Sequence, residues 1–299
     1  MLVRNVIADS SPVRRCLETS LSVLGGMFPP TESQIWSSSA DISKQWQPLG
    51  VSTVEPKRAY MLGDANYCPL ANFYADKVDQ LPETKDFLLK HQDFIERFTR
   101  FSGYNATKNW GIVSSLYDAL TCEENYFGNE FKWPKWIEDV GSDCKEQMKA
   151  FRNFGFYIEG KLGQIFLKLR AGTFLKTLLD RLQNIASLGE INDENRQVNT
   201  YGTHDTVISW ILHALGFFTE QPSFGSGLII ELRKDLSTFE PIVHLYYSNL
   251  TNNFDIYELP LNESNTFKNH CNSTSCKLVD FASSLQVYLP ADIEKECEV

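Results

Sequence analysis

A histidine and an aspartate stand together where a predicted strand gives way to a predicted helix. The run Tyr201-Gly202-Thr203-His204-Asp205-Thr206 follows a short strand at 198–201 and leads into an apolar helix at 206–215. The free amides and the dipole of a helix start favour an anion there, and α/β proteins bind ligands at the carboxyl ends of strands. His204 can donate a hydrogen bond to such an anion, and Asp205 can act as a general acid. Asp205 can equally serve as an ordinary helix N-cap.

The elements that would position this pair alternate along the last third of the chain. Apolar runs predict strands, helical spacing predicts helices, and strand, helix, strand and strand around one core is an α/β pattern. A similar alternation occurs near the amino end. The expected strands are 5–8, 51–54, 198–201, 227–232, 242–247 and 252–259, and the expected core helices are 13–27 and 206–215.

The middle third contains little strand signal, and its apolar residues recur at helical spacing. It therefore predicts a helical insertion into the α/β fold. We expect an α/β core from residues 1–65 and 160–299 and a helical cap from residues 66–159. The helices expected in the middle third are 84–103, 107–122, 144–156 and 162–188, the last of which falls in the second part of the core.

Composition limits the classes of function. The chain has 299 residues, about two domains by length. Its 28 Lys and Arg against 38 Asp and Glu give a net charge of −10. Clustered cations hold nucleic acid, so this balance argues against a nucleic-acid partner. No apolar run approaches 18 residues, so no membrane span is expected.

Cysteines and glycosylation sequons favour a secretory history. The chain has seven cysteines and four N-x-Ser/Thr sequons, at Asn105, Asn249, Asn262 and Asn272. The segment Cys271 to Cys276 is typical of a small disulfide loop. An extracellular or luminal protein is favoured over a cytosolic one with incidental cysteines. Because the first residues lack the apolar core of a secretory signal, we expect the natural start to lie upstream.

An ordered series of short blocks resembles the histidine acid phosphatases, the secreted and lysosomal branch of the histidine phosphatase superfamily. The His204-Asp205 run is similar to that family's second signature. The insect venom-type and the prostatic and lysosomal types look closest. The other blocks are Ser10-Ser11, Arg15-Cys16-Leu17, Phe28-Pro29-Pro30, Trp46-Gln47-Pro48, Asn66-Tyr67-Cys68-Pro69, Leu116-Tyr117-Asp118, Leu169-Arg170-Ala171-Gly172, Glu231-Leu232, Tyr246-Tyr247, Cys271 to Cys276, and Pro290 with Cys297.

The resemblance implies a fold and a reaction. The fold is α/β, with a Rossmann-like sheet core of the phosphoglycerate-mutase type and an inserted, mainly helical cap. In the reaction, a histidine of an Arg-His-Gly motif attacks a phosphate monoester, and water hydrolyses the resulting phosphohistidine. His204 would share the clamp on the phosphate, Asp205 would protonate the leaving alkoxide, and the helix start at Thr206 would add a weaker phosphate contact. No metal or cofactor is implied.

The resemblance also implies disulfides, partners and a location. Cys68 is expected to pair with Cys297 and Cys271 with Cys276, whereas Cys122 is either free or paired with Cys144. The expected partners are small phosphomonoesters or phosphate, and the family's dimers make a homodimer a further expectation. The parent protein is expected to be extracellular or lysosomal.

The chain departs from the family pattern at two places. None of its five histidines lies between Arg and Gly, so the Arg-His-Gly motif is absent. Alignment through Phe28-Pro29-Pro30 puts Asp9 where the family has a phosphate-binding arginine. Each unit charge pair at about 4 Å is worth about 4 kcal/mol at an effective dielectric near 20, so a carboxylate there would repel phosphate. We therefore predict little or no phosphatase activity for this chain.

Two explanations of these departures stay open. The chain can be an amino-terminally truncated or mis-spliced form of an active enzyme, as the missing signal and motif suggest. It can instead be a catalytically inactive relative that acts as a secreted binding or interaction protein, which the Asp9 substitution favours.

Overall fold

The computed structural model describes residues 5–37, 44, 46–63, 68–188, 197–249 and 255–298. The chain divides into two compact units. The first, here called the core unit, comprises Met1–Asn72, Gln164–Phe217 and Pro222–Val299; the second, the helical unit, comprises Phe73–Gly163 and Phe218–Gln221.

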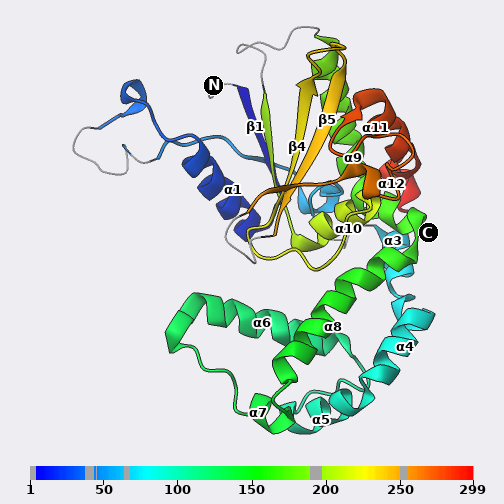
Figure 1. Ribbon diagram of the computed structural model, residues 1–299. Coiled ribbons are helices and arrows are strands. Elements are labelled where there is room, and N and C mark those ends of the chain that lie inside the picture. The colour runs from blue at the N-terminus through cyan, green and yellow to red at the C-terminus, as the bar shows by residue number, and fades with distance from the viewer. Residues whose placement is uncertain are drawn as a thin grey trace. The chain divides into compact units, whose positions relative to one another are not determined.

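A short parallel sheet places the predicted chemistry in the core unit (Figure 1). Its strand order is β2 (Ser52–Thr53), β1 (Val6–Ser10) and β3 (Val198–Gly202). In the pairing of β1 with β3, Asp9 lies opposite Tyr201 and Ser10 opposite Gly202. Because the strands are parallel, their carboxyl ends meet at one edge of the sheet. The residues that follow β1 and β3 therefore come together there.

Helices cover both faces of this sheet. Successive side chains of a strand point to opposite faces, and Tyr201 accepts a hydrogen bond from Arg181 of α9 (Gln164–Ser187). Gly202 faces the other way, toward α1 (Arg14–Met27), where an added Cβ would lie 2.9 Å from the carbonyl oxygen of Cys16. Glycine at 202 thus lets α1 approach the end of β3 closely.

A second, antiparallel sheet completes the core unit. It joins β4 (Gly227–Lys234), β5 (Pro241–Ser248) and β6 (Tyr257–Glu258), and β7 (Cys276–Lys277) also pairs with β5. Residues 252–254 of the strand expected at 252–259 lie outside the described residues. Of the remaining residues, only Tyr257 and Glu258 form a strand, β6. In the β4–β5 turn, hydrogen bonds from Ser237 and Thr238 lower the pKa of Asp235 to about 2.

Apolar helix faces build the interior of the core unit. The helix α10 (Asp205–Leu215) buries seven of its residues, among them Trp210, and it ends at Gly216 with a left-handed φ of 76°. The helix α9 packs against α10, with Phe166 and Trp210 edge to face at 6.2 Å between ring centroids. Two shorter helices, α11 (Leu278–Leu285) and α12 (Ile293–Glu296), complete this region.

The helical unit has its own apolar core. Its fully or almost fully buried side chains include Phe94, Phe98, Val113, Met148 and Phe151. Because these side chains pack with one another, the unit is held by its own contacts. Its helices are α4 (Pro82–Lys90), α5 (Gln92–Ser102), α6 (Gly111–Phe127), α7 (Trp136–Val140) and α8 (Cys144–Glu159), and α3 (Pro69–Ala75) leads into it.

One helix prediction in this unit is wrong. The pattern at 84–103 predicts one helix, but α4 and α5 are separate and meet at His91, whose φ of −105° and ψ of 13° leave the helical range. The His91 ring lies edge to face with the Phe151 ring, at 5.4 Å between ring centroids, and its Nδ1 lies 2.8 Å from the Gln147 side chain. These tertiary contacts hold the break, and the apolar spacing continues across it.

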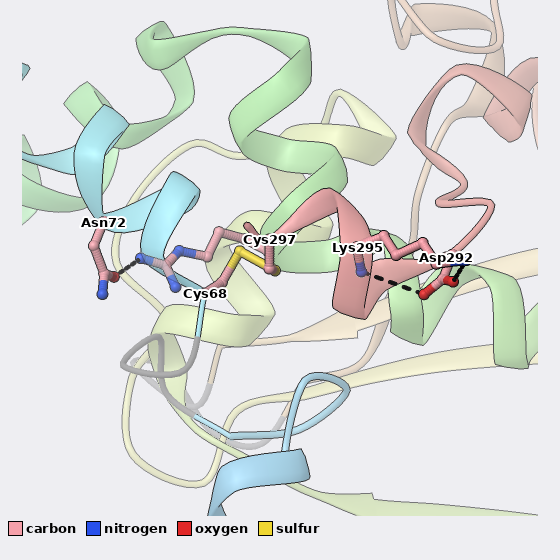
Figure 2. Close-up of a disulfide and its surroundings, with 6 residues drawn as sticks. Cys68, Asn72, Asp292, Lys295 and Cys297 are labelled. Carbon is pink, nitrogen blue, oxygen red and sulfur yellow. Dashed lines mark hydrogen bonds and ion pairs between the residues drawn. A yellow bond between two sulfur atoms is a disulfide. The ribbon is translucent and has the colours of Figure 1, made fainter. Parts of the chain in front are cut away.

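Both disulfides implied by the resemblance are present. Cys68 is bonded to Cys297 across 229 residues, and Cys271 to Cys276 across five. Figure 2 shows the first of them between α3 and α12, where Asn72 and Lys295 also lie. Arg170 donates a hydrogen bond of 2.8 Å to Asn72 beside this disulfide.

Cys144 does not pair with Cys122. It is a free thiol, fully buried at the start of α8. Burial is the main cause that raises the pKa of Cys144, to about 11. A thiol that stays protonated at neutral pH is a poor nucleophile, so Cys144 is a packing residue.

Within the described residues, no helix combines the length and the apolar character needed to cross a bilayer.

We expect the two disulfides to contribute different amounts to the free energy of unfolding. Closing a loop of 229 residues removes far more unfolded-chain entropy than closing one of five. We expect Cys68→Ala with Cys297→Ala to lower the free energy of unfolding by about 5 kcal/mol, and Cys271→Ala with Cys276→Ala by about 2 kcal/mol. Urea unfolding followed by circular dichroism measures both. Equal losses for the two pairs would contradict the loop-length argument.

Candidate functional site

The predicted His204 lies at the meeting point of β1, β3 and two helix starts. It follows β3 with extended backbone angles and occupies the N-cap position of α10. Its side chain is only 6% exposed. Ser11 comes directly after β1, and its Oγ lies 2.9 Å from the Nε2 of His204. Arg15, in the first turn of α1, places Nη2 at 3.2 Å from the Nδ1 of His204.

These two contacts assign the tautomer of His204. A guanidinium can only donate, so the Nδ1 of His204 accepts from Arg15 and carries no proton in this arrangement. The proton of the neutral ring is therefore on Nε2, which donates to the Oγ of Ser11. Ser11 is fully buried, and its own amide donates to the carbonyl of Gly202 at 2.8 Å. Hydrogen bonds at both nitrogens, from Ser11 and Arg15, therefore hold the ring in place.

Cys16 packs on the same ring. Its Sγ lies 3.7 Å from Nε2 and 3.9 Å from Nδ1 of His204, and 3.5 Å from the carbonyl oxygen of Thr203. Nearly equal distances to both nitrogens place the sulfur against the ring as a whole. Cys16 is 4% exposed, so it lies on the buried face of α1.

The helix α10 begins at Asp205, one residue before the predicted start, and its N-cap residue is His204 rather than Asp205. One carboxylate oxygen of Asp205 accepts from the backbone amide of Thr206 at 2.9 Å. This bond satisfies one of the amides that a helix start leaves without a partner. The Oγ1 of Thr206 is buried and has no hydrogen-bond partner in the part of the chain that the structure describes.

Asp9 does not point toward His204 as an uncompensated charge. Its Oδ2 forms an ion pair of 2.9 Å with Nη2 of Arg181. Arg181 also donates to the hydroxyl of Tyr201 at 2.7 Å and to Asn199 at 3.1 Å. The pair lies on the face of the sheet that α9 covers. The repulsion of phosphate expected from Asp9 is therefore reduced by a cation in direct contact with it.

Burial and charge shift the titration of this cluster. Burial raises the pKa of Tyr201, against the opposing charge of Arg181. Burial alone would lower the pKa of Arg181, but the hydrogen bond with Asp9 and the interaction with Tyr201 raise it overall. Arg181 therefore stays charged, and Tyr201 stays neutral at physiological pH.

Three residues of this region are not among the predicted site residues: Ser11, Arg15 and Arg181. Ser11 and Arg15 belong to blocks that carry the family resemblance, which is the signal that could have found them. Arg14, the neighbour of Arg15, faces solvent with a side chain 91% exposed and pairs with Glu18. Arg181 is one of many charged residues on a long helix, and its spacing carries no comparable signal.

Most of the sequence matches a known protein family. A sequence model of the histidine phosphatase superfamily (branch 2) matches residues 2–248. This chain belongs to that family. The chain is 26% identical to prostatic acid phosphatase of Rattus norvegicus, over 98% of this chain and 71% of that protein. It is 25% identical to prostatic acid phosphatase of Homo sapiens, over 98% of this chain and 70% of that protein.

A lysosomal relative and a solved structure are also similar to this chain. Lysosomal acid phosphatase of Rattus norvegicus is 25% identical, over 99% of this chain and 65% of that protein. Among solved structures, the phytase of Klebsiella sp ASR1 matches with a TM-score of 0.56 and 11% identity, over 97% of this chain and 78% of that chain. The fold is therefore the α/β fold with a helical cap that the histidine phosphatase resemblance implies.

The ion pair between Asp9 and Arg181 predicts a measurable coupling. We expect Asp9→Ala and Arg181→Ala to destabilise the protein singly, and the double variant to lose less than the sum, with a coupling of about 1 to 3 kcal/mol. The cause is that each single variant leaves a half-buried charge without its partner. Urea unfolding of the four proteins measures the coupling.

The exposed pair Arg14 and Glu18 is the matched control for this cycle, because surface ion pairs contribute little. We expect a clearly smaller coupling for Arg14→Ala with Glu18→Ala than for the Asp9 pair. If the Asp9 and Arg181 effects add without coupling, the proposed neutralisation of Asp9 is wrong.

Proposed function

We propose that the chain is an acid phosphatase-like protein that binds the phosphate group of small phosphomonoesters beside His204. The observation that carries the proposal is the contact of Arg15 with His204. In a protein with a net charge of −10, an anion depends on a few local cations. Arg15 is exposed to solvent while its guanidinium lies 3.2 Å from a buried histidine. A phosphate oxygen can therefore meet both groups.

Each residue of the site has a role in this proposal. Arg15 supplies charge and paired N–H donors, which suit the oxygens of phosphate. His204 shares the phosphate, and the start of α10 at Thr206 adds a weaker contact, because the helix dipole favours an anion there. Asp205 is the proton donor to the leaving alkoxide. The carboxylate of Asp205 already lies at the helix start through its bond to Thr206.

Turnover needs a nucleophile as well as a phosphate site. In the family reaction another histidine, besides the one that matches His204, attacks phosphorus. The four other histidines of this chain lie elsewhere in the structure. His91 contacts Gln147 in the helical unit, and His244 pairs with Glu258 between β5 and β6. His213 lies in the last turn of α10, nine residues beyond His204, and His270 is exposed on a turn. We therefore propose that this chain binds phosphomonoesters and hydrolyses them slowly.

The second candidate function is that of a catalytically inactive binding protein on the same fold. The ion pair of Asp9 with Arg181 favours it, because the position that the family gives to a phosphate-binding arginine is here engaged in a contact that stabilises the sheet. In both candidates the phosphate site beside His204 is the same, and turnover separates them.

We also propose an extracellular or lysosomal location for the parent protein. The names of the prostatic and lysosomal relatives and the two disulfides support this location, because disulfides persist in oxidising compartments.

The first test of the proposal measures hydrolysis. Purified protein is incubated with p-nitrophenyl phosphate near pH 5, beside a His204→Ala control. We expect slow release of p-nitrophenol, only a little above the rate of the control, because a phosphate site without a nucleophile gives little turnover. Release equal to that of the control would instead support the inactive binding protein. Clear hydrolysis that disappears in His204→Ala would overturn slow turnover and establish the chain as an enzyme.

The second test measures binding of inorganic phosphate by calorimetry. Arg15→Ala removes a charged hydrogen bond worth about 1.5 to 3 kcal/mol, so we expect the Kd to rise tenfold or more. Arg14→Ala is the matched control: it removes an equal charge one residue away, from a side chain that faces solvent. Equal effects of Arg14→Ala and Arg15→Ala would show that only the general field matters, and would remove the support for this site.

A further inference from the structure

The ring of His204 has one nitrogen in the interior and one beside an exposed cation. Its Nε2 lies 2.9 Å from the Oγ of Ser11, a residue that is fully buried. Its Nδ1 lies 3.2 Å from Nη2 of Arg15, a residue that is exposed. An anion that reaches Arg15 from solvent therefore meets Nδ1, whereas Nε2 is engaged with Ser11.

Ser11 is held in place by its own backbone. Its amide donates to the carbonyl of Gly202 at 2.8 Å, and its carbonyl accepts from the Oγ of Ser10 at 3.0 Å. Pro12 follows, and a residue before proline is restricted to extended backbone angles. Because this backbone is fixed at the end of β1 and the side chain is buried, the Oγ of Ser11 is a fixed partner for Nε2 of His204.

These contacts determine where a proton can be added to the neutral ring. Nε2 already carries the proton that it donates to Ser11, so an added proton must go to Nδ1. In the free protein that proton would point at the guanidinium of Arg15, and two positive charges in contact repel each other. The free protein therefore holds His204 in its neutral form above about pH 7, where an ordinary histidine is already mostly neutral.

We propose that Ser11 is a positioning residue that couples the binding of a tetrahedral dianion to the uptake of one proton at Nδ1 of His204. The N–H groups of Arg15 turn to the oxygens of the anion, and two negative charges then face Nδ1. A proton from solvent binds to Nδ1, which donates it to the anion in a hydrogen bond. Nε2 keeps its bond to Ser11, so the ring does not have to move. This inference rests on the phosphate site of the proposed function.

Other titratable groups lie around His204 and must be separated from it. They are Arg15 and Cys16 from α1 and Asp205 from α10, whereas the neighbour from the end of β1 is the uncharged Ser11. The carboxyl group of Asp205 can also take up a proton when an anion binds, and the thiol of Cys16 can lose one at high pH. The variant His204→Gln keeps both groups and removes only the ring, so it isolates the contribution of His204.

The first measurement is calorimetry with sulfate, a tetrahedral dianion that does not itself change protonation near neutral pH. Titrations of the full 299-residue chain in buffers of different ionisation enthalpy give the number of protons taken up. We expect close to one proton per sulfate. The complex holds a proton that the free protein lacks, so the Kd rises with pH, by up to about tenfold for each pH unit above about pH 7. His204→Gln cannot accept a proton and shows neither the uptake nor the slope.

The second measurement identifies the protonated nitrogens of His204 by nitrogen NMR of the histidine-labelled chain, with His204→Gln to assign the signals. We expect a proton on Nε2 alone in the free protein and on both nitrogens with saturating sulfate. Ser11→Ala removes the acceptor of Nε2, so we expect both neutral tautomers and a Kd about three to ten times higher. Ser11→Thr keeps the hydroxyl and restores the wild-type signals. Ser10→Ala is the matched control, because its buried hydroxyl donates to the carbonyl of Ser11.

Circular dichroism checks the fold of each variant, and the wild-type measurements decide even if a variant does not fold. A proton on Nδ1 of the free protein would overturn the proposal. Equal effects of Ser10→Ala and Ser11→Ala would remove the positioning role of Ser11. Sulfate binding that depends on Arg15 but takes up no proton would contradict this inference alone. Absence of any binding of sulfate or phosphate would contradict the proposed function together with it.

Discussion

The parallel pairing of β1 with β3 is the constraint on which the site depends. It places two residues 193 positions apart, Ser11 and His204, within 2.9 Å of each other. Neither strand is long, so the register matters: Ser10 opposite Gly202 brings both chain continuations to the same edge. A slip of one residue would turn every side chain of β3 to the other face. The helices α1 and α10 then start from this edge and point their free amides toward it.

The charges of the site follow from the two faces of that sheet. Asp9 and Tyr201 point to the face that α9 covers, and there Arg181 meets both. Arg15 comes from α1 on the opposite side and meets His204 at the edge. One arginine therefore stabilises the sheet, and the other remains exposed beside the histidine. The exposed one is available to an anion, and this asymmetry is what makes a phosphate site plausible in an acidic chain.

Local patterns in the sequence predict the strands and helices around the site, because each has a clear period or a sharp boundary. The helix start at His204-Asp205 is such a boundary, and the structure places α10 there. The break at His91 could not be predicted, because it depends on the Phe151 ring and the Gln147 amide, both from the distant helix α8. The contact of Arg15 with His204 was beyond reach for the same reason. Nothing in the local sequence of α1 specifies a partner 189 residues away.

Asp205 shows why a structural and a chemical role need not compete. Its contact with the amide of Thr206 uses one carboxyl oxygen. A carboxylic acid carries its proton on one oxygen and accepts with the other, so accepting from this amide and donating a proton are compatible. The bond to Thr206 also fixes the carboxyl group beside His204, the N-cap residue, which a donor to a leaving group requires. An aspartate at this helix start therefore fits both the fold and the proton-donor role that we propose for it, which is why the sequence pattern alone could not separate the two roles.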